Sequence, residues 1–150
     1  MAERDDGKVA YGELATGLEQ ISTHFAVDSW NVLAESPGYV KLRVPLLARL
    51  KNRRLQLFGG YTPAYVDMLA YRVARSGTLG ESDTFFATTS MHIDYLEALT
   101  GDDFEVECQL LKARGRNAIT EARFFQDGLW RSSPSRPCSL CRIRLQRADP

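Results

Sequence analysis

Residues 59–75, GGYTPAYVDMLAYRVAR, decide how this chain is expected to fold. The stretch opens with two glycines, is otherwise mostly apolar or small, and is rich in good helix formers. Pro63 is compatible with a helix because it falls near the first turn, where its missing N–H costs no hydrogen bond. We therefore predict one long helix over residues 59–76. Because most of its sides are apolar, we expect the helix to be largely buried.

Asp67 is the only carboxylate between Gly59 and Gly80. A buried carboxylate is costly unless it is paired, solvated by a cavity or active in chemistry. Asp67 therefore has two interpretations. It lies on a solvent-exposed face of the helix, or it is a functional acid, and the residues alone favour neither.

The segments on either side of this helix have their own periodicity. Apolar residues recur at three- and four-residue steps before it, which predicts an amphipathic helix over residues 11–25. Alternating apolar and polar residues predict strands on both sides of the long helix. The predicted strands are residues 30–33, 39–44, 84–96, 104–110, 117–125 and 138–145.

The order of elements predicts the fold class. Four strands joined by tight turns form antiparallel sheets, and a mostly apolar helix needs a sheet to cover it. We expect an α+β fold in which an antiparallel sheet wraps a long central helix. The 150 residues suit a single domain, 1–150.

Composition excludes several classes of protein. Lys plus Arg and Asp plus Glu are both 19, so no net positive field draws the chain to nucleic acid. No stretch approaches the roughly 20 apolar residues of a membrane span. Three cysteines, an odd number, favour a reducing, cytoplasmic location. Cys138 and Cys141 lack a second ligand pair, so we expect no metal site; on one strand their side chains would take opposite faces.

Asn52, Gly59-Gly60 and Asp67 are spaced as in the PaaI-like acyl-CoA thioesterases, which belong to the hotdog-fold superfamily of 4-hydroxybenzoyl-CoA thioesterases. Thr88 precedes a Tyr-Leu pair by seven residues, which also resembles the family, and the resemblance runs from residue 40 to 145. Three positions depart from it. Phe58 stands where the family usually has His, Leu55 replaces a common Gly, and Glu97-Ala98 replaces a basic residue followed by Pro.

The resemblance implies a hotdog fold, hydrolysis of an acyl thioester, and a homodimer or homotetramer. It implies no cofactor, since coenzyme A enters as part of the substrate. Asp67 would act as general base on a water or as a nucleophile. A helix N-terminus holds free N–H groups, so Gly59 and Gly60 would polarise the thioester carbonyl. Taken without the family spacing, the two glycines would indicate only a tight turn or close packing.

Thr88 and Asn52 have supporting roles in this comparison. Thr88 would orient the water or the carboxylate, and Asn52 would hold the loop before the helix or touch the carbonyl. Strand parity places Thr88 on the face opposite Met91 and Ile93. If those residues pack on the helix, Thr88 points away from its own subunit's core. That suits a site shared across a dimer, unless Thr89 is the relevant residue.

Four arginines are candidates for binding the phosphates of coenzyme A: Arg53, Arg54, Arg114 and Arg116. The sequence does not decide whether the acyl carrier is coenzyme A or an acyl-carrier protein. It also does not distinguish a phosphate-binding role of these arginines from that of ordinary surface charges. Two alternative functions remain. One is a non-catalytic module that binds acyl thioesters or apolar ligands, which Phe58 favours. The other is a hotdog dehydratase or synthase-pathway protein.

Overall fold

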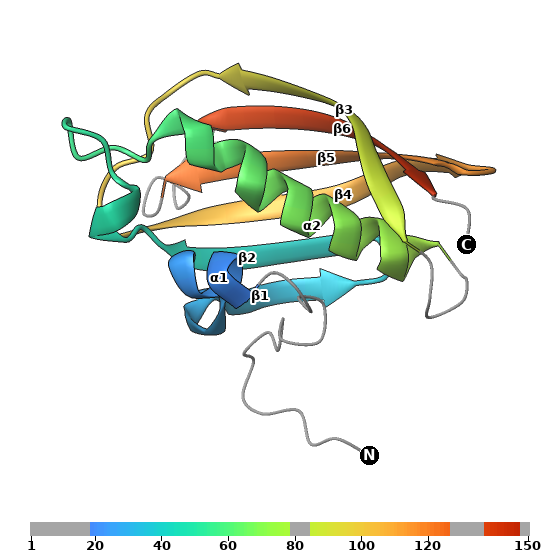
Figure 1. Cartoon of the computed structure of the whole chain (residues 1–150), viewed down its shortest axis with the longest axis horizontal. Helices are drawn as coiled ribbons and strands as arrows, with labels where there is room; N and C mark the ends of the chain where they lie inside the picture. The colour runs from blue at the N-terminus through green and yellow to red at the C-terminus, as the bar shows by residue number, and fades with distance from the viewer. Residues whose placement is uncertain (1–18, 79–84, 127–136, 148–150) are drawn as a thin grey trace, which may run out of the picture.

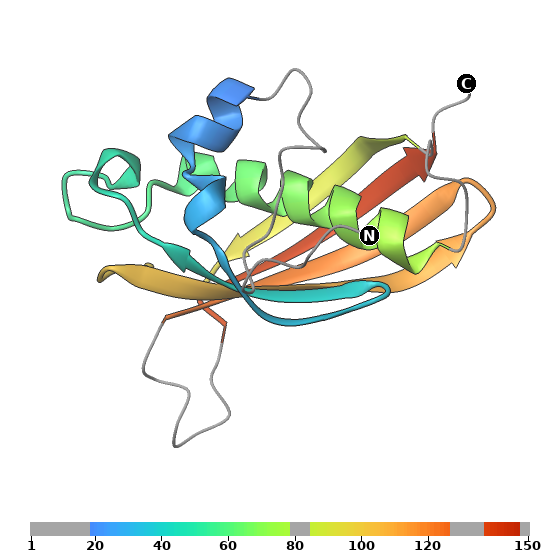
Figure 2. The same cartoon turned by 90° about the horizontal axis from the view of Figure 1, so that it is seen from below.

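The computed structural model describes residues 19–78, 85–126 and 137–147. In these residues a six-stranded antiparallel sheet carries one long helix across its concave face (Figures 1 and 2). The strand order is β1-β2-β4-β5-β6-β3. The predicted α+β architecture, a sheet wrapped around a long helix, is confirmed.

The elements lie where the periodicity placed them, with adjusted ends. The strands are β1 (Asn31–Ser36), β2 (Tyr39–Pro45), β3 (Phe86–Tyr95), β4 (Asp103–Arg114), β5 (Asn117–Gln126) and β6 (Ser139–Arg147). The helices are α1 (Glu19–His24) and α2 (Thr62–Gly77), with 3-10 turns η2 (Val27–Ser29), η3 (Ala48–Leu50) and η4 (Gly59–Tyr61). The predicted helix 59–76 thus begins as a 3-10 turn. Of the predicted helix 11–25, residues 11–18 lie outside the described residues.

One face of α2 forms the centre of the core. Tyr65, Leu69 and Val73 recur along it at helical spacing and are buried against the sheet. The sheet contributes alternate residues of its strands to the same cluster. These include Leu42, Val44, Phe104, Val106, Cys108, Ala122, Phe124, Ile143 and Leu145.

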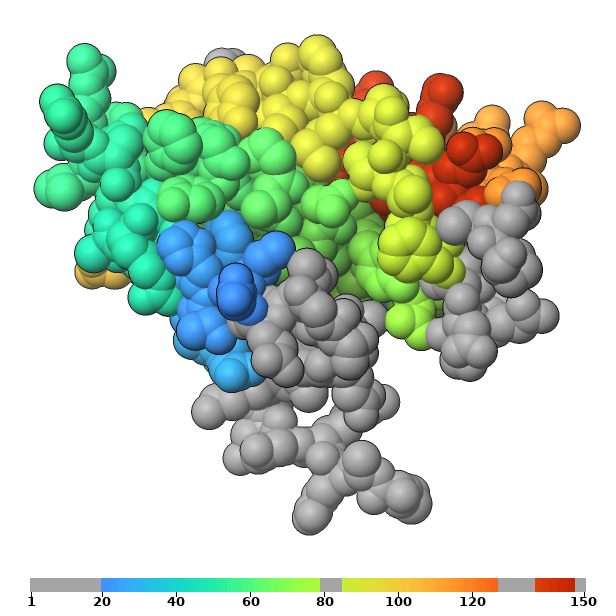
Figure 3. Space-filling model, in the orientation of Figure 1, coloured from blue at the N-terminus to red at the C-terminus, as the bar shows by residue number. Residues whose placement is uncertain are grey.

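The opposite side of α2 is not covered by any segment that the structure describes, and Asp67 lies on it, exposed. In Figure 3 the surface of α2 remains visible between β3 and the α1 segment. The expectation that the helix would be largely buried around Asp67 is therefore wrong. A single sheet reaches only one side of a helix, so the other side stays open within one chain.

The outer face of the sheet carries charged side chains arranged in pairs. Glu105 contacts Lys41 at 3.1 Å and Arg43 at 2.9 Å. Glu121 is bound by Arg142 at 3.0 Å and by Arg123 at 2.7 Å. Burial by itself would raise the pKa of the Glu121 carboxyl, but the hydrogen bonds from the two arginines outweigh it and hold that pKa below its usual value.

The cysteines are free and buried. Cys138 lies one residue before β6 and Cys141 lies within it, so the expected placement on opposite faces of one strand is wrong, and both belong to the core. Burial raises the pKa of the Cys141 thiol to about 12. Among the described residues no three His, Cys, Asp or Glu side chains are grouped as metal ligands. None of the described helices has the length and apolarity needed to cross a membrane.

Gly77 ends α2 where the helix meets the turn between β1 and β2. A Cβ atom at Gly77 would lie 2.8 Å from the Gly38 Cα and 2.6 Å from the Leu110 Cδ2. Because the Gly38 Cα is a backbone atom, the clash can be relieved only if the helix and the turn move apart. We expect Gly77→Ala to lower the free energy of unfolding by about 1–3 kcal/mol, measured by urea denaturation.

Gly115 offers a control for this prediction, because a Cβ there would meet nothing within 4 Å. Its φ of +56° suits Asn, so Gly115→Asn should change stability by no more than about 0.5 kcal/mol. Equal effects of the two substitutions would show that the contact between Gly77 and Gly38 is not what limits stability.

Candidate functional site

The opening of the central helix leaves two backbone donors free. In η4 the Tyr61 N–H donates to the Phe58 carbonyl at 2.9 Å, and the Thr62 N–H donates to the Gly59 carbonyl. The N–H groups of Gly59 and Gly60 donate to no described residue. Both N–H groups lie at the N-terminus of the helix, which carries a partial positive charge. Free N–H groups in this position can stabilise an oxygen that becomes negative during a reaction.

Gly60 also has a packing reason to be glycine. A Cβ atom there would lie 2.5 Å from Cε1 of Phe58, whose ring is 55% exposed and packs edge-on against Tyr61. Phe58 therefore lies over the helix opening, at the position where the family usually has His. Its ring can neither donate nor accept a conventional hydrogen bond there.

Asn52 holds the loop that leads into the helix. Its Oδ1 accepts hydrogen bonds from the backbone N–H of Arg54 at 2.8 Å and of Gln56 at 3.2 Å. The Asn52 N–H in turn donates to the Gln56 carbonyl at 2.7 Å. Of the two roles expected for Asn52, holding the loop is the one that its contacts show.

Leu55 sits at the tip of this loop with a φ of +59° and 69% of its surface exposed. A left-handed conformation costs a residue with a Cβ about 1–2 kcal/mol, whereas glycine adopts it freely but loses about 0.5–1 kcal/mol of chain entropy. We expect Leu55→Gly to raise the free energy of unfolding by about 0.5–1 kcal/mol in urea denaturation. Leu55→Ala keeps the backbone penalty and should give no such gain. If both variants gain equally, loss of an exposed apolar side chain is the cause.

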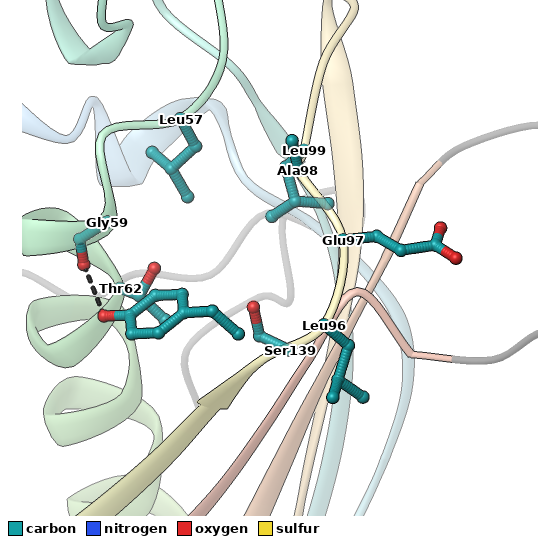
Figure 4. A pocket seen from close by; sticks show the side chains of 9 residues that line it. Leu57, Gly59, Thr62, Leu96, Glu97, Ala98, Leu99 and Ser139 are labelled. Atoms are coloured by element: carbon teal, nitrogen blue, oxygen red, sulfur yellow. Dashed lines mark hydrogen bonds between the residues drawn. The ribbon is translucent and has the colours of Figure 1, made fainter.

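A pocket of about 330 Å³ lies beside the helix opening (Figure 4). Tyr95, at the end of β3, closes one side of it, and its hydroxyl donates to the Gly59 carbonyl at 2.7 Å. The pocket is lined by Leu57, Gly59, Thr62, Tyr95, Leu96, Glu97, Ala98, Leu99 and Ser139. A residue of the edge strand β3 thus holds the carbonyl of Gly59, the residue whose N–H is free.

Asp67 and Thr88 form a hydrogen-bonded pair in one chain. The Thr88 hydroxyl donates to Oδ1 of Asp67, and both side chains are exposed. The second carboxylate oxygen of Asp67 accepts no hydrogen bond from a described residue. The pair is therefore open to a water on the uncovered side of α2.

Thr88 reaches Asp67 because β3 contains a β-bulge. Thr88 pairs with Leu145 and Met91 pairs with Ile143, and both partners are buried on the helix side of β6. Thr88 and Met91 are three residues apart yet share that face, because Thr89 is the extra residue of the bulge. The expectation that Thr88 points away from its own helix is wrong, and Thr89 is not the relevant residue; its hydroxyl donates to the Arg144 carbonyl.

Gly59 and Asp67 do not meet within one chain. Eight residues of helix separate them by about 12 Å along its axis. Asp67 is not among the residues that line the pocket beside Gly59. One chain thus presents two half-sites on the same helix, a donor half at Gly59 and an acid half at Asp67 and Thr88.

The four candidate arginines lie at opposite ends of the fold. Arg53 and Arg54 are exposed in the loop before the helix opening. Arg114 and Arg116 flank the β4–β5 turn at the other end of the sheet, beyond the C-terminal end of α2 (Figure 1). The Arg116 guanidinium also donates to the Arg147 carbonyl at 3.0 Å. Of the four, Arg53 and Arg54 belong to the loop that leads into Gly59.

Sequence reasoning missed the two residues that bring a free hydroxyl to the pocket, Thr62 and Ser139. Each begins an element, α2 and β6 respectively, and each is almost fully buried. A signal for Ser139 was present, since it shares the apolar face of its strand with Cys141, Ile143 and Leu145. A lone hydroxyl in such a row faces the core side of the sheet.

Comparison with known proteins finds a matching family model. Residues 56–129 match the family model described as the thioesterase superfamily. No curated protein sequence matches the chain.

Solved structures share the fold at low sequence identity. A thioesterase family protein from Silicibacter pomeroyi has a TM-score of 0.73 and 17% identity over 92% of this chain and 96% of that one. Thioesterase superfamily member 2 of zebrafish has a TM-score of 0.69 and 20% identity over 88% and 96%. The BH2602 protein from Bacillus halodurans, crystallised with CoA, has a TM-score of 0.71 and 10% identity over 92% and 84%.

Proposed function

Because this chain carries a hotdog domain of the thioesterase superfamily, we propose that it hydrolyses an acyl thioester to a free acid and a thiol. The observation that carries the proposal is the hydrogen bond from Thr88 to Asp67. It fixes one oxygen of an exposed acid and leaves the other for a water, as a general base requires.

The proposed reaction uses both half-sites. The free N–H groups of Gly59 and Gly60 bind the thioester oxygen and stabilise the negative charge that it gains on attack. In the general-base route, Asp67 takes a proton from water as the water oxygen bonds to the carbonyl carbon. The C–S bond then breaks, and the thiolate leaves and takes up a proton. In the nucleophilic route, an Asp67 carboxylate oxygen bonds to the carbonyl carbon, the C–S bond breaks, and the thiolate leaves and takes up a proton. Water then hydrolyses the resulting anhydride, which releases the free acid and restores Asp67.

A homodimer would complete this site. The separation of about 12 Å between Gly59 and Asp67 is too long for one carbonyl group to contact both. β3 is an edge strand of the sheet and leaves backbone groups available for a second copy. A two-fold pairing of these edges would set the donor half of one subunit against the acid half of its partner. Two such dimers would form a homotetramer. Sedimentation analysis tests the assembly, and a monomer at micromolar concentration would contradict a shared site.

Coenzyme A is the carrier that we propose for the acyl group, in the cytoplasm. The related fold of the BH2602 protein, crystallised with CoA, supports it. Arg53 and Arg54, exposed beside the helix opening, provide cations for the phosphates. Three free thiols fit a reducing compartment. An acyl-carrier-protein thioester is the alternative, and parallel assays with both carriers distinguish them.

A second candidate function rests on Phe58. Its half-exposed ring lies over Gly60 and supplies an apolar surface where a hydrogen-bonding side chain is usual in the family. This favours a module that binds acyl thioesters or apolar ligands without cleaving them.

Thiol release decides between the two candidates. The wild-type protein is incubated with a panel of acyl-CoA and acyl-carrier-protein thioesters, and free thiol is measured with a chromogenic disulfide reagent. We expect release above background from at least one substrate. If none is cleaved while acyl-CoA still binds, the hydrolase proposal fails and the binding module stands.

A further inference from the structure

Two hydroxyl groups in the pocket beside Gly59 have no hydrogen-bond partner among the described residues. Thr62 is 2% exposed and Ser139 is 3% exposed. Figure 4 shows both hydroxyl oxygens turned into the space between the helix opening and the strand ends, while the Glu97 carboxylate points away from it. The same pocket contains the Gly59 end of the helix.

The fold brings these two hydroxyls together from distant parts of the chain. Thr62 is the first residue of α2 and Ser139 the first residue of β6. Ser139 pairs with Tyr95, whose own hydroxyl is bound to the Gly59 carbonyl at 2.7 Å. The helix opening, Tyr95 and the two hydroxyls therefore surround a single cavity.

Within an empty pocket these two hydroxyls are left to water, because the described residues offer them no partner. A ligand that displaces this water loses affinity unless it replaces the hydrogen bonds. Because both hydroxyls face one cavity, a ligand that fills it must supply a group that pairs with them. A hydroxyl both donates and accepts, so it pairs with a hydroxyl or a carbonyl oxygen. None of the described residues that line the pocket is cationic, so a carboxylate would find no countercharge among them.

We propose that this pocket holds the acyl group of the substrate and selects acyl groups that carry a hydroxyl or oxo oxygen over unsubstituted alkyl groups. The inference rests on the proposed thioester hydrolysis and names its substrate class. The volume of about 330 Å³ is at the small end for ligand pockets, which restricts the acyl group to a short one.

Matched pairs of substrates test the inference on the wild-type protein. The pairs are 3-hydroxybutyryl-CoA with butyryl-CoA and acetoacetyl-CoA with butyryl-CoA. We expect kcat/KM to be about tenfold or more higher for the oxygenated member of each pair, because the unsubstituted acyl group leaves both hydroxyls unpaired. Equal kcat/KM values would overturn the inference and leave the hydrolase proposal standing.

Variants locate the preference in the two hydroxyls. Thr62→Val and Ser139→Ala remove a hydroxyl with little change of shape, and each should bring the kcat/KM ratio several-fold closer to one. Thr62→Ser retains the hydroxyl and should retain the preference. Ser90→Ala removes an exposed hydroxyl on β3 that does not line the pocket and serves as the control. A preference that survives Thr62→Val and Ser139→Ala combined in a folded protein would contradict the assignment.

Binding measurements test the selectivity of the pocket independently of thioester hydrolysis. If the wild type cleaves no thioester, the hydrolase proposal fails, and calorimetric titration then compares affinities for 3-hydroxybutyryl-CoA and butyryl-CoA. Tighter binding of the first, lost in Ser139→Ala, would support the pocket's selectivity. Equal affinities would overturn it.

Discussion

Asp67→Asn is expected to lower kcat for thioester hydrolysis by about 10²–10⁴-fold, the range attributed to a general base. The amide retains an oxygen that accepts the Thr88 hydroxyl but cannot take a proton from water. Asp67 is exposed, so the substitution should leave the melting temperature nearly unchanged. Steady-state thiol release and a thermal melt on the same preparation measure both effects.

Asp94 provides the matched control. It is a second exposed acid, on β3, and its carboxylate contacts His92 at 3.2 Å rather than α2. Asp94→Asn should retain wild-type kcat. Equal activity of Asp67→Asn and the wild type would leave the fold intact and remove Asp67 from the mechanism.

Gly59→Pro is expected to lower kcat by about 10²–10³-fold, as loss of one oxyanion donor does in other enzymes. Proline removes the free N–H of Gly59 and nothing else from the backbone hydrogen bonds, since that group donates to no described residue. The position tolerates proline because it opens a helix, and Phe58 before it is extended, with φ −64° and ψ 122°.

Gly59→Ala separates the lost donor from added bulk. A Cβ atom at Gly59 would lie 3.3 Å from Cε1 of Tyr95, a tight contact that both substitutions create. Alanine keeps the N–H, so its kcat should stay within about tenfold of wild type. If alanine and proline are equally damaging, displacement of Tyr95 is the cause, and Gly59 is not an oxyanion donor.

Mixing the two inactive variants tests the shared site. In a dimer of Gly59→Pro with Asp67→Asn, one site carries both substitutions and the other carries neither. Random pairing makes half of the dimers mixed, so about a quarter of wild-type activity should return after the variants are unfolded and refolded together. If each site is built from one chain, mixing restores nothing.

The order of elements and the strand positions were predictable because they depend on local periodicity. Alternation in β2 and β4 and helical spacing in α2 reflect which side chains one face of an element must bury. The positions of the two glycines at the helix opening and of Asp67 along the helix were likewise predictable, because both are local properties. Parity failed at Thr88, because one extra residue in a strand reverses the face of all residues before it.

What the sequence by itself determined is the helical segment that opens at Gly59, the acid two turns into it, and the strands that flank it. Only the tertiary structure decided which of these residues lie close together. It placed Thr88 on Asp67 through the bulge, bound Tyr95 to the Gly59 carbonyl, and set Thr62 of the helix and Ser139 of the sheet around one pocket. These arrangements join residues far apart in the chain, and they depend on how strands and helix pack and on a bulge that the alternation of side chains did not reveal.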